Sequence, residues 1–354
     1  MAHRRRTSDL VDPGLRNILD DLRKQVISGK LPPGSRVPAV RELAATYGVA
    51  GTTIHRCLQE LTAAGFLSTH GRNGTRVVDF PPHRHRFGLV LPQLAGPDGG
   101  YSERHWQAKS VAAQIISAGG TRQVEIFHGI NSHPELPQHA HLLAAIAERR
   151  LAGLIIPDEE AIADWLTPAD IGIPVVGVAI VAGHPAVGNL LLDVKVFIEQ
   201  ALAAVAKQGL KRTAVLCDVH AHHLIPHMQA CAGSLRLDLP HRHIQCLPTA
   251  GPEWATQVIA ALFDCPSSQQ PEALILSDEI SIPAVESALD SRGIGSIFQV
   301  HVANLPLPSR SHRPALRLGW DHRRYLQRAM DLIDAWHAEA RPIGIESLPL
   351  EACL

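Results

Sequence analysis

The order of patterns within residues 1–80 constrains the fold most strongly. Apolar residues recur at helical spacing in three consecutive segments, 13–29, 39–46 and 50–64, and a Gly residue lies at or just beyond the end of each. Two short β segments then flank residues 70–74, whose Gly and Asn content is typical of a hairpin turn. Three helices followed by a hairpin predict a winged helix-turn-helix, an α+β domain.

The charge of the chain is divided unevenly between this segment and the rest. Residues 1–80 hold 12 Lys/Arg and 7 Asp/Glu, a net charge of +5, although the whole chain has a formal net charge of −1. The remaining residues therefore carry a net charge of −6. A basic segment joined to an acidic body is typical of a nucleic-acid-binding module on a body that avoids polyanions.

The third predicted helix has the composition of a helix that enters the DNA major groove. The residues expected in the core recur at helical spacing and are Ile54, Cys57, Leu58 and Leu61. Small polar residues stand on the opposite side of the first turn, where they allow close approach to the groove. Arg41 begins the second helix, and the backbone N–H groups at the start of that helix can also face a phosphate. The candidate DNA contacts of the domain are Arg36, Arg41, Thr52, Thr53, His55, Arg56, His70 and Arg72.

Residues 27–77 resemble the GntR family of bacterial regulators. The landmarks are the Gly-x-Leu-Pro-Pro-Gly-x-x-x-Pro loop, the Arg-Glu-Leu-Ala helix, the Thr-Thr pair and the Gly-Phe-Leu wing that ends in Gly-Thr. The resemblance implies a homodimeric repressor or activator that binds a palindromic duplex DNA operator. It also implies that Arg41, Thr52, Thr53, His70 and Gly71 contact DNA.

This segment departs from the usual GntR pattern on its reading surface. Family members have Ser or Thr and then Arg where this chain has Ala50 and Gly51, and they often have Arg where His55 stands. Two guanidinium groups that would each discriminate a base by about 1–3 kcal/mol are therefore missing. We expect an operator that is bound more weakly than those typical of the family, or that differs from them in sequence.

The pattern of apolar and polar residues changes after the wing. Residues 81–86, Pro-Pro-His-Arg-His-Arg, have the composition of a stiff polar linker. From residue 87 apolar strand-like runs alternate with helical segments, which predicts βαβ units and doubly wound parallel sheets. Residues 87–354 are too many for one small sheet, so we expect a two-lobed α/β domain that binds an effector and dimerises.

The body resembles the periplasmic-binding-protein-like domain of LacI-type repressors, and its combination with a GntR head is similar to arabinose-responsive repressors. The pieces that match are FGLVLPQLAGP, GLIIP, IPVVGV, LLDVKVFIEQALAAVAKQGLKRTAVLCD and ALILSDEISIPAVESALDSRG. The resemblance implies a small-molecule effector, such as a sugar, bound between the lobes at the carboxyl ends of the strands. The candidate effector contacts are Gln93, Tyr101, Trp106, Asp278, Asn304 and Trp320.

Other interpretations of the same residues stay open. Trp106 and Trp320 can equally be buried at a lobe or dimer interface, and Asp278 can be a helix N-cap. LacI-type bodies usually hold ligand hydroxyls with an Arg after the strand that matches 212–217, and residues 220–228 contain no Arg. The effector is then unusual, or the body only dimerises and senses nothing.

Several functional classes lack a signature in this sequence. No Gly-x-Ser-x-Gly, Gly-rich phosphate loop or His-Glu-x-x-His motif is present, so we expect neither an enzyme nor a cofactor. His220, His222, His223 and His227 cluster without a matching Cys or carboxylate, and we predict no metal site there. The six Cys are scattered and no run reaches 18 apolar residues, which favours a cytoplasmic, nucleoid-associated protein without a membrane partner.

Overall fold

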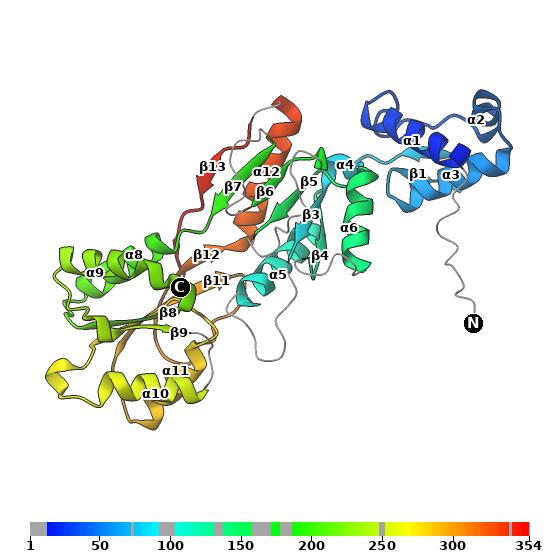
Figure 1. Ribbon diagram of the computed structural model, residues 1–354. Coiled ribbons are helices and arrows are strands. Elements are labelled where there is room, and N and C mark those ends of the chain that lie inside the picture. The colour runs from blue at the N-terminus through cyan, green and yellow to red at the C-terminus, as the bar shows by residue number, and fades with distance from the viewer. Residues whose placement is uncertain are drawn as a thin grey trace, which may run out of the picture.

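A computed structural model describes residues 13–71, 74–91, 103–130, 137–157, 171–177, 186–247, 252–339 and 342–353. A small head, mostly helical, is followed along the chain by two α/β lobes (Figure 1). Among these residues, no helix combines the length and the apolar character needed to cross a membrane.

The head is the winged helix-turn-helix that the sequence predicts. It consists of α1 (Pro13–Ile27), α2 (Val40–Tyr47), α3 (Gly51–Ala63), β1 (Leu67–Thr69) and β2 (Thr75–Val77). The two strands pair in antiparallel fashion, with Leu67 opposite Val77. One apolar cluster unites all five elements, and Cys57 is fully buried within it, as expected for a core residue.

The turn between α2 and α3 depends on Gly48. This residue adopts φ 65° and ψ 34°, and its backbone N–H donates to the carbonyl of Ala44. A left-handed conformation is strained for residues with a Cβ atom, which explains why Gly ends this helix. The tight turn sets the direction in which α3 leaves α2.

The connection between the head and the body is packed and partly helical. Pro82–His85 forms the short helix α4, which leads directly into β3 (Arg86–Val90). Pro81 and Pro82 are buried, and the ring of His83 stacks on Phe66 of the head with centroids 6.0 Å apart. The segment predicted as a stiff polar linker is thus partly helical, and its two prolines and His83 bury apolar surface.

The first lobe is built on a fully parallel sheet. Its strand order is β13-β7-β6-β5-β3-β4, where β4 is Gln123–Phe127, β5 is Gly153–Ile156, β6 is Val175–Gly177, β7 is Val187–Leu191 and β13 is Ile345–Ser347. Separate apolar clusters cover the two faces, one against α5 (Glu103–Gly119) and α12 (His322–Glu339) and the other against α6 (Pro137–Ala147). Burial on both faces explains the continuous apolar runs of the strands.

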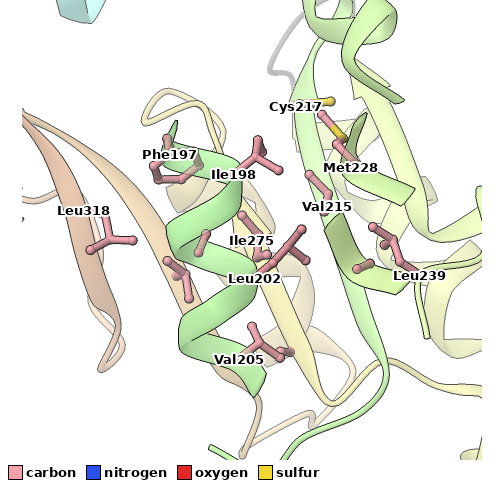
Figure 2. Packing of buried hydrophobic residues seen from close by; sticks show 14 of the residues in the cluster. Phe197, Ile198, Leu202, Val205, Val215, Cys217, Met228, Leu239, Ile275 and Leu318 are labelled. Atoms are coloured by element: carbon pink, nitrogen blue, oxygen red, sulfur yellow. The ribbon is translucent and has the colours of Figure 1, made fainter. Parts of the chain in front are cut away.

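The second lobe repeats this plan. Its order is β14-β12-β11-β10-β8-β9, where β8 is Thr213–Asp218, β9 is Ile244–Leu247, β10 is Ala273–Leu276, β11 is Phe298–Leu305, β12 is Leu316–Asp321 and β14 is Glu351–Cys353. All neighbours are parallel except β14, which pairs with β12 in antiparallel fashion. The helices α8 (Val194–Lys207), α9 (Ile225–Ser234), α10 (Pro252–Phe263) and α11 (Ile282–Ser291) cover its faces. Figure 2 shows Phe197, Ile198 and Leu202 of α8 packed over the strands.

The chain passes between the lobes three times. It crosses from β7 to α8, from β12 to α12 and from β13 to β14. Because α12 starts at the end of β12 of the second lobe and packs in the core of the first lobe, it joins the two lobes directly. The predicted two-lobed arrangement of doubly wound sheets is confirmed.

Candidate nucleic-acid interface and effector site

The outer face of α3 is exposed, as contact with a DNA groove requires. Ile54 and Leu61 are fully or almost fully buried, whereas Thr52, His55 and Arg56 are exposed and Thr53 is half-buried. The Nε of Arg56 lies 3.2 Å from Glu60 Oε1, and the Nε2 of His55 lies 3.2 Å from Gln59 Nε2. The exposed residues at the start of α3 therefore form one polar surface, as the sequence predicts for a recognition helix.

The N-termini of α2 and α3 suit contact with phosphate. Neither Ala39 nor Ala50, the residues before these helices, provides a side-chain cap, and at α2 the Oε2 of Glu42 accepts only from the N–H of Ala39, at 3.1 Å. Uncapped backbone N–H groups at a helix start favour an anion. Arg41 is exposed in the first turn of α2, and within the described ranges no ion pair or hydrogen bond to protein holds its guanidinium.

The hairpin brings further basic groups to its tip. His70 is exposed and its Nε2 lies 3.0 Å from Ser68 Oγ, and Gly71 adopts φ 48°. The backbone of Arg36 forms an isolated bridge to Arg76, and its guanidinium lies against Gly74. Arg72 lies outside the described residues.

Arg76 is a further basic residue of the wing that the sequence analysis did not name. It is exposed on β2, and its Nη1 donates to the carbonyl of Gly34 at 2.9 Å. The signal that would have found it is an exposed basic residue on a wing strand, between the half-buried Thr75 and the buried Val77.

Three of the predicted effector residues lie at the ends of neighbouring strands. Asp278 follows β10, Asn304 is the penultimate residue of β11, and Trp320 is the penultimate residue of β12. Asn304 and Trp320 are direct partners in the parallel ladder. Trp106 lies on α5, buried in the core of the first lobe, and Gln93 and Tyr101 lie outside the described residues.

A buried polar cluster surrounds Asn304. Its Nδ2 donates to Glu279 Oε2 at 3.1 Å, and its Oδ1 lies 3.1 Å from the Nε2 of His322. Arg317 Nη2 lies 3.9 Å from the other carboxylate oxygen of Glu279. Glu279, Asn304 and His322 are all almost fully buried. The hydrogen bonds between them therefore hold the carboxyl group of Glu279 and the amide of Asn304 in one arrangement.

Sequence reasoning missed Glu279 and His322. Glu279 is the third residue after β10, in Ser-Asp-Glu, and His322 directly follows Asp321, the last residue of β12. Polar residues in that position meet at the carboxyl edge of a parallel sheet. The cluster therefore extends the predicted set by residues of the same kind.

Asp278 has a structural task in this arrangement. Its Oδ1 accepts from the N–H of Ile280 at 2.9 Å, and its Oδ2 accepts from the N–H of Ser281 at 3.2 Å. These bonds stabilise the turn that leads into α11, whose N-cap residue is Ser281 and not Asp278. Its role toward an effector stays a prediction.

Two aromatic residues near the cluster present polar atoms inside the protein. Trp320 is 2% exposed, and neither its Nε1 nor the hydroxyl of Tyr325 has a protein partner among the described residues. The Nζ of the buried Lys109 lies 5.6 Å from the centroid of the Tyr325 ring. Burial raises the pKa of Tyr325, so its hydroxyl stays protonated and can donate.

The described residues contain no group of three or more His, Cys, Asp or Glu side chains placed to hold a metal ion. The exposed rings of His222 and His223 meet edge to face, with centroids 6.0 Å apart.

The head matches a known family. Residues 15–77 match the model of bacterial regulatory proteins of the gntR family. The HTH-type transcriptional regulator Rv1152 of Mycobacterium tuberculosis is 46% identical over 69 residues, which cover 18% of this chain and 57% of that protein. The mannosyl-D-glycerate transport/metabolism system repressor MngR of Escherichia coli is 30% identical over 93 residues, 26% of this chain and 37% of that protein. The likeness to these relatives thus spans about half of their length or less.

The body matches solved structures in fold. A probable maltose operon transcriptional repressor from Staphylococcus aureus superposes with a TM-score of 0.58 at 14% identity, over 77% of this chain and 96% of that one. The trehalose repressor from Escherichia coli gives 0.55 at 13% identity, over 76% of this chain and all of that one. Residues 15–77 are therefore a helix-turn-helix head of the gntR family, and the lobes that follow have the fold of LacI-type repressors.

Proposed function

We propose that this protein is a transcriptional repressor that binds a palindromic operator as a homodimer and is controlled by a small molecule bound between its lobes. The observation that carries the proposal is the exposed polar start of α3, with Arg41 beside it, on a gntR-type head joined to a LacI-type body. Such a regulator works on nucleoid DNA in the cytoplasm.

The chemistry of the second lobe supports a polyhydroxylated effector such as a sugar. Glu279 and Asn304 accept and donate hydrogen bonds from a buried position, and Trp320 adds an aromatic ring with an unpartnered N–H. Sugar sites combine these features, because hydroxyls need bonding partners and the ring faces are apolar. The related MngR and the structurally similar trehalose and maltose repressors carry names that point to carbohydrate control.

Effector binding would act by changing the populations of two lobe arrangements. A ligand that binds a closed arrangement more tightly shifts the equilibrium by its difference in affinity for the two states. The paired heads would then change their separation, and operator affinity with it. The same coupling requires that operator DNA changes effector affinity by an equal factor.

The test combines a thermal-unfolding screen with operator binding. We expect at least one sugar to raise the unfolding temperature of the whole chain, and the same sugar to change operator affinity. Asn304→Ala should abolish the thermal shift, while Gln257→Ala, which removes an exposed amide from α10 of the same lobe, should retain it. A broad panel without any stabilising compound would contradict the sensing role.

A body that only dimerises is the second candidate. It is favoured by the burial of Trp106 and Trp320 in the lobe cores and by the use of the Asp278 carboxylate in the turn before α11. Under this alternative, operator affinity is the same with every compound, and Asn304→Ala lowers stability alone.

A further inference from the structure

Two cysteines of the second lobe lie in contact across neighbouring strands. Cys217 of β8 and Cys246 of β9 are direct partners in the parallel ladder, and their Sγ atoms are 3.4 Å apart. Cys217 Sγ also lies 3.8 Å from the carbonyl of Gln245, whereas the thiols of Cys57 and Cys265 have the backbone carbonyls of Leu15 and Leu262 as partners and, within the described residues, no second cysteine. We propose that Cys217 and Cys246 form a redox modification site, at which a peroxide converts two thiols into a reversible cross-strand disulfide.

The backbone already has the spacing that a disulfide needs. Neighbouring strands lie about 4.7–4.9 Å apart, and disulfides join Cα atoms about 4.4–6.8 Å apart. Partners in a parallel ladder project their side chains to the same face, and both residues pack in the cluster beneath α8 and α9, where Figure 2 shows Cys217 and Met228. Closing the bond therefore needs a shortening of the sulfur separation without a change of register.

Access to the pair is through Cys246. Cys217 is fully buried, whereas Cys246 is half-buried on β9, which is the edge strand of the sheet. In the first step the Cys246 thiolate attacks one peroxide oxygen, the O–O bond breaks, and one water leaves after protonation, which gives a sulfenic acid. Cys217 then attacks the Cys246 sulfur, the S–O bond breaks and a second water leaves. The thiols lose two electrons in total and the peroxide gains them.

The position of the pair gives the modification a consequence for the lobe. Each cysteine is the penultimate residue of its strand, at the same carboxyl edge that holds Asn304. A covalent bond would tie the edge strand β9, which has one neighbouring strand, to β8. The amides of β9 should then exchange more slowly, because local opening of an edge strand becomes restricted.

The test treats the full chain with hydrogen peroxide and measures thiols, intact mass and digested peptides. We expect the loss of two titratable thiols, a mass decrease of two hydrogens, a linked peptide pair that contains Cys217 and Cys246, and reversal by dithiothreitol. Cys246→Ser should abolish the linked pair, and the matched Cys265→Ser should retain it. If Cys246 gains oxygen atoms without a linked peptide, or the protein stays unchanged, the proposal is overturned.

Hydrogen exchange supplies the second readout. The exchange of β9 amides should slow at least severalfold in oxidised wild-type protein, and it should not change on peroxide treatment of Cys217→Ala. Equal exchange rates in the oxidised and reduced wild type would overturn the claim that the bond restrains the lobe. Neither measurement depends on operator or effector binding.

Discussion

Arg41 is the side chain whose role in DNA binding can be tested most cleanly. It is exposed in the first turn of α2 and carries no ion pair within the described ranges, so its removal should leave the fold intact. We expect Arg41→Ala to weaken operator binding by about 1–3 kcal/mol and to lower the slope of log K against log salt by about one. Fluorescence anisotropy with labelled duplexes over a range of salt concentrations measures both quantities.

Arg242→Ala is the matched control for charge. It removes one exposed guanidinium from the second lobe, where Arg242 bonds to Gln269. Operator affinity should stay within experimental error of the wild type. If both variants lose affinity equally, the effect comes from net charge and Arg41 has no local role.

His301 makes the stability of the second lobe dependent on pH. Burial on β11, and secondarily the charge of Arg317, lowers its pKa from 6.5 to about 4. The unfolded chain therefore binds more protons between these values, and the stabilising contribution present above pH 6.5 is lost as the pH falls toward 4. The loss amounts to about 3 kcal/mol at most.

Thermal unfolding between pH 7 and pH 4 measures this dependence. His301→Gln should make it shallower without abolishing it, because burial also lowers the pKa values of His83 and His243, whereas the exposed His222→Gln should leave it as in the wild type. An unchanged pH profile in His301→Gln would show that other groups control acid stability.

Single residues differ in how far the sequence predicts their place. Cys57 was predicted as core because it repeats with Ile54 and Leu61 at helical spacing, and it is fully buried. Glu279 was missed, because its burial depends on Asn304 and Arg317, which are brought to it by neighbouring strands. A local pattern reports periodic burial, but it does not report which polar groups meet across a sheet.

At the scale of elements, the turn between α2 and α3 provides a test of the head. Gly48→Ala places a Cβ atom on a residue at φ 65°, and we expect a loss of roughly 1–2 kcal/mol in the free energy of unfolding. Gly51→Ala is the control, since its Cβ would lie 3.5 Å from Val40 Cγ1 in ordinary contact. That variant should gain about 0.5 kcal/mol or less.

Chemical denaturation of the two variants gives these free energies. Equal effects of the two substitutions would contradict the special conformation of Gly48, since both replace Gly by Ala within four residues of each other.

The elements of the head were predictable because each is local. The three helices are predicted to within two residues at most ends, since apolar periodicity and Gly stops lie within each segment. The sequence did not predict β7, β12, β13 and β14, because the partners of these strands lie elsewhere in the chain. The three-residue strands β13 and β14 are also too short to show a pattern of their own.

At the scale of the whole molecule, α12 connects the polar cluster to the head. At its start His322 contacts Asn304, and at its end the Nε2 of His337 lies 2.6 Å from the carbonyl of Ala152. Arg84 of α4 donates to the carbonyl of His337 at 3.4 Å, beside a cavity of about 790 Å³ between the head and the first lobe. This continuous path would carry a change at the lobes to the DNA-binding surface.

We predict that loosening this junction uncouples the two activities. In His337→Ala, which removes the bond to Ala152, effector binding and operator binding should each persist, while the effect of one on the other decreases. Calorimetry of effector binding with and without operator DNA measures the coupling. If the coupling between effector and operator binding is unchanged in this variant, other contacts transmit it and the role of this junction is contradicted.

The central claim is that the head reads duplex DNA through α3 and its neighbours, and selection from randomised duplexes by the full chain tests it most directly. We predict enrichment of a sequence with two related half-sites about 10 base pairs apart, or a multiple of that spacing, and loss of the enrichment when Arg41, Thr52 and Thr53 are replaced by Ala. Failure of the wild-type protein to enrich any sequence, or identical enrichment by the triple variant, would contradict the account.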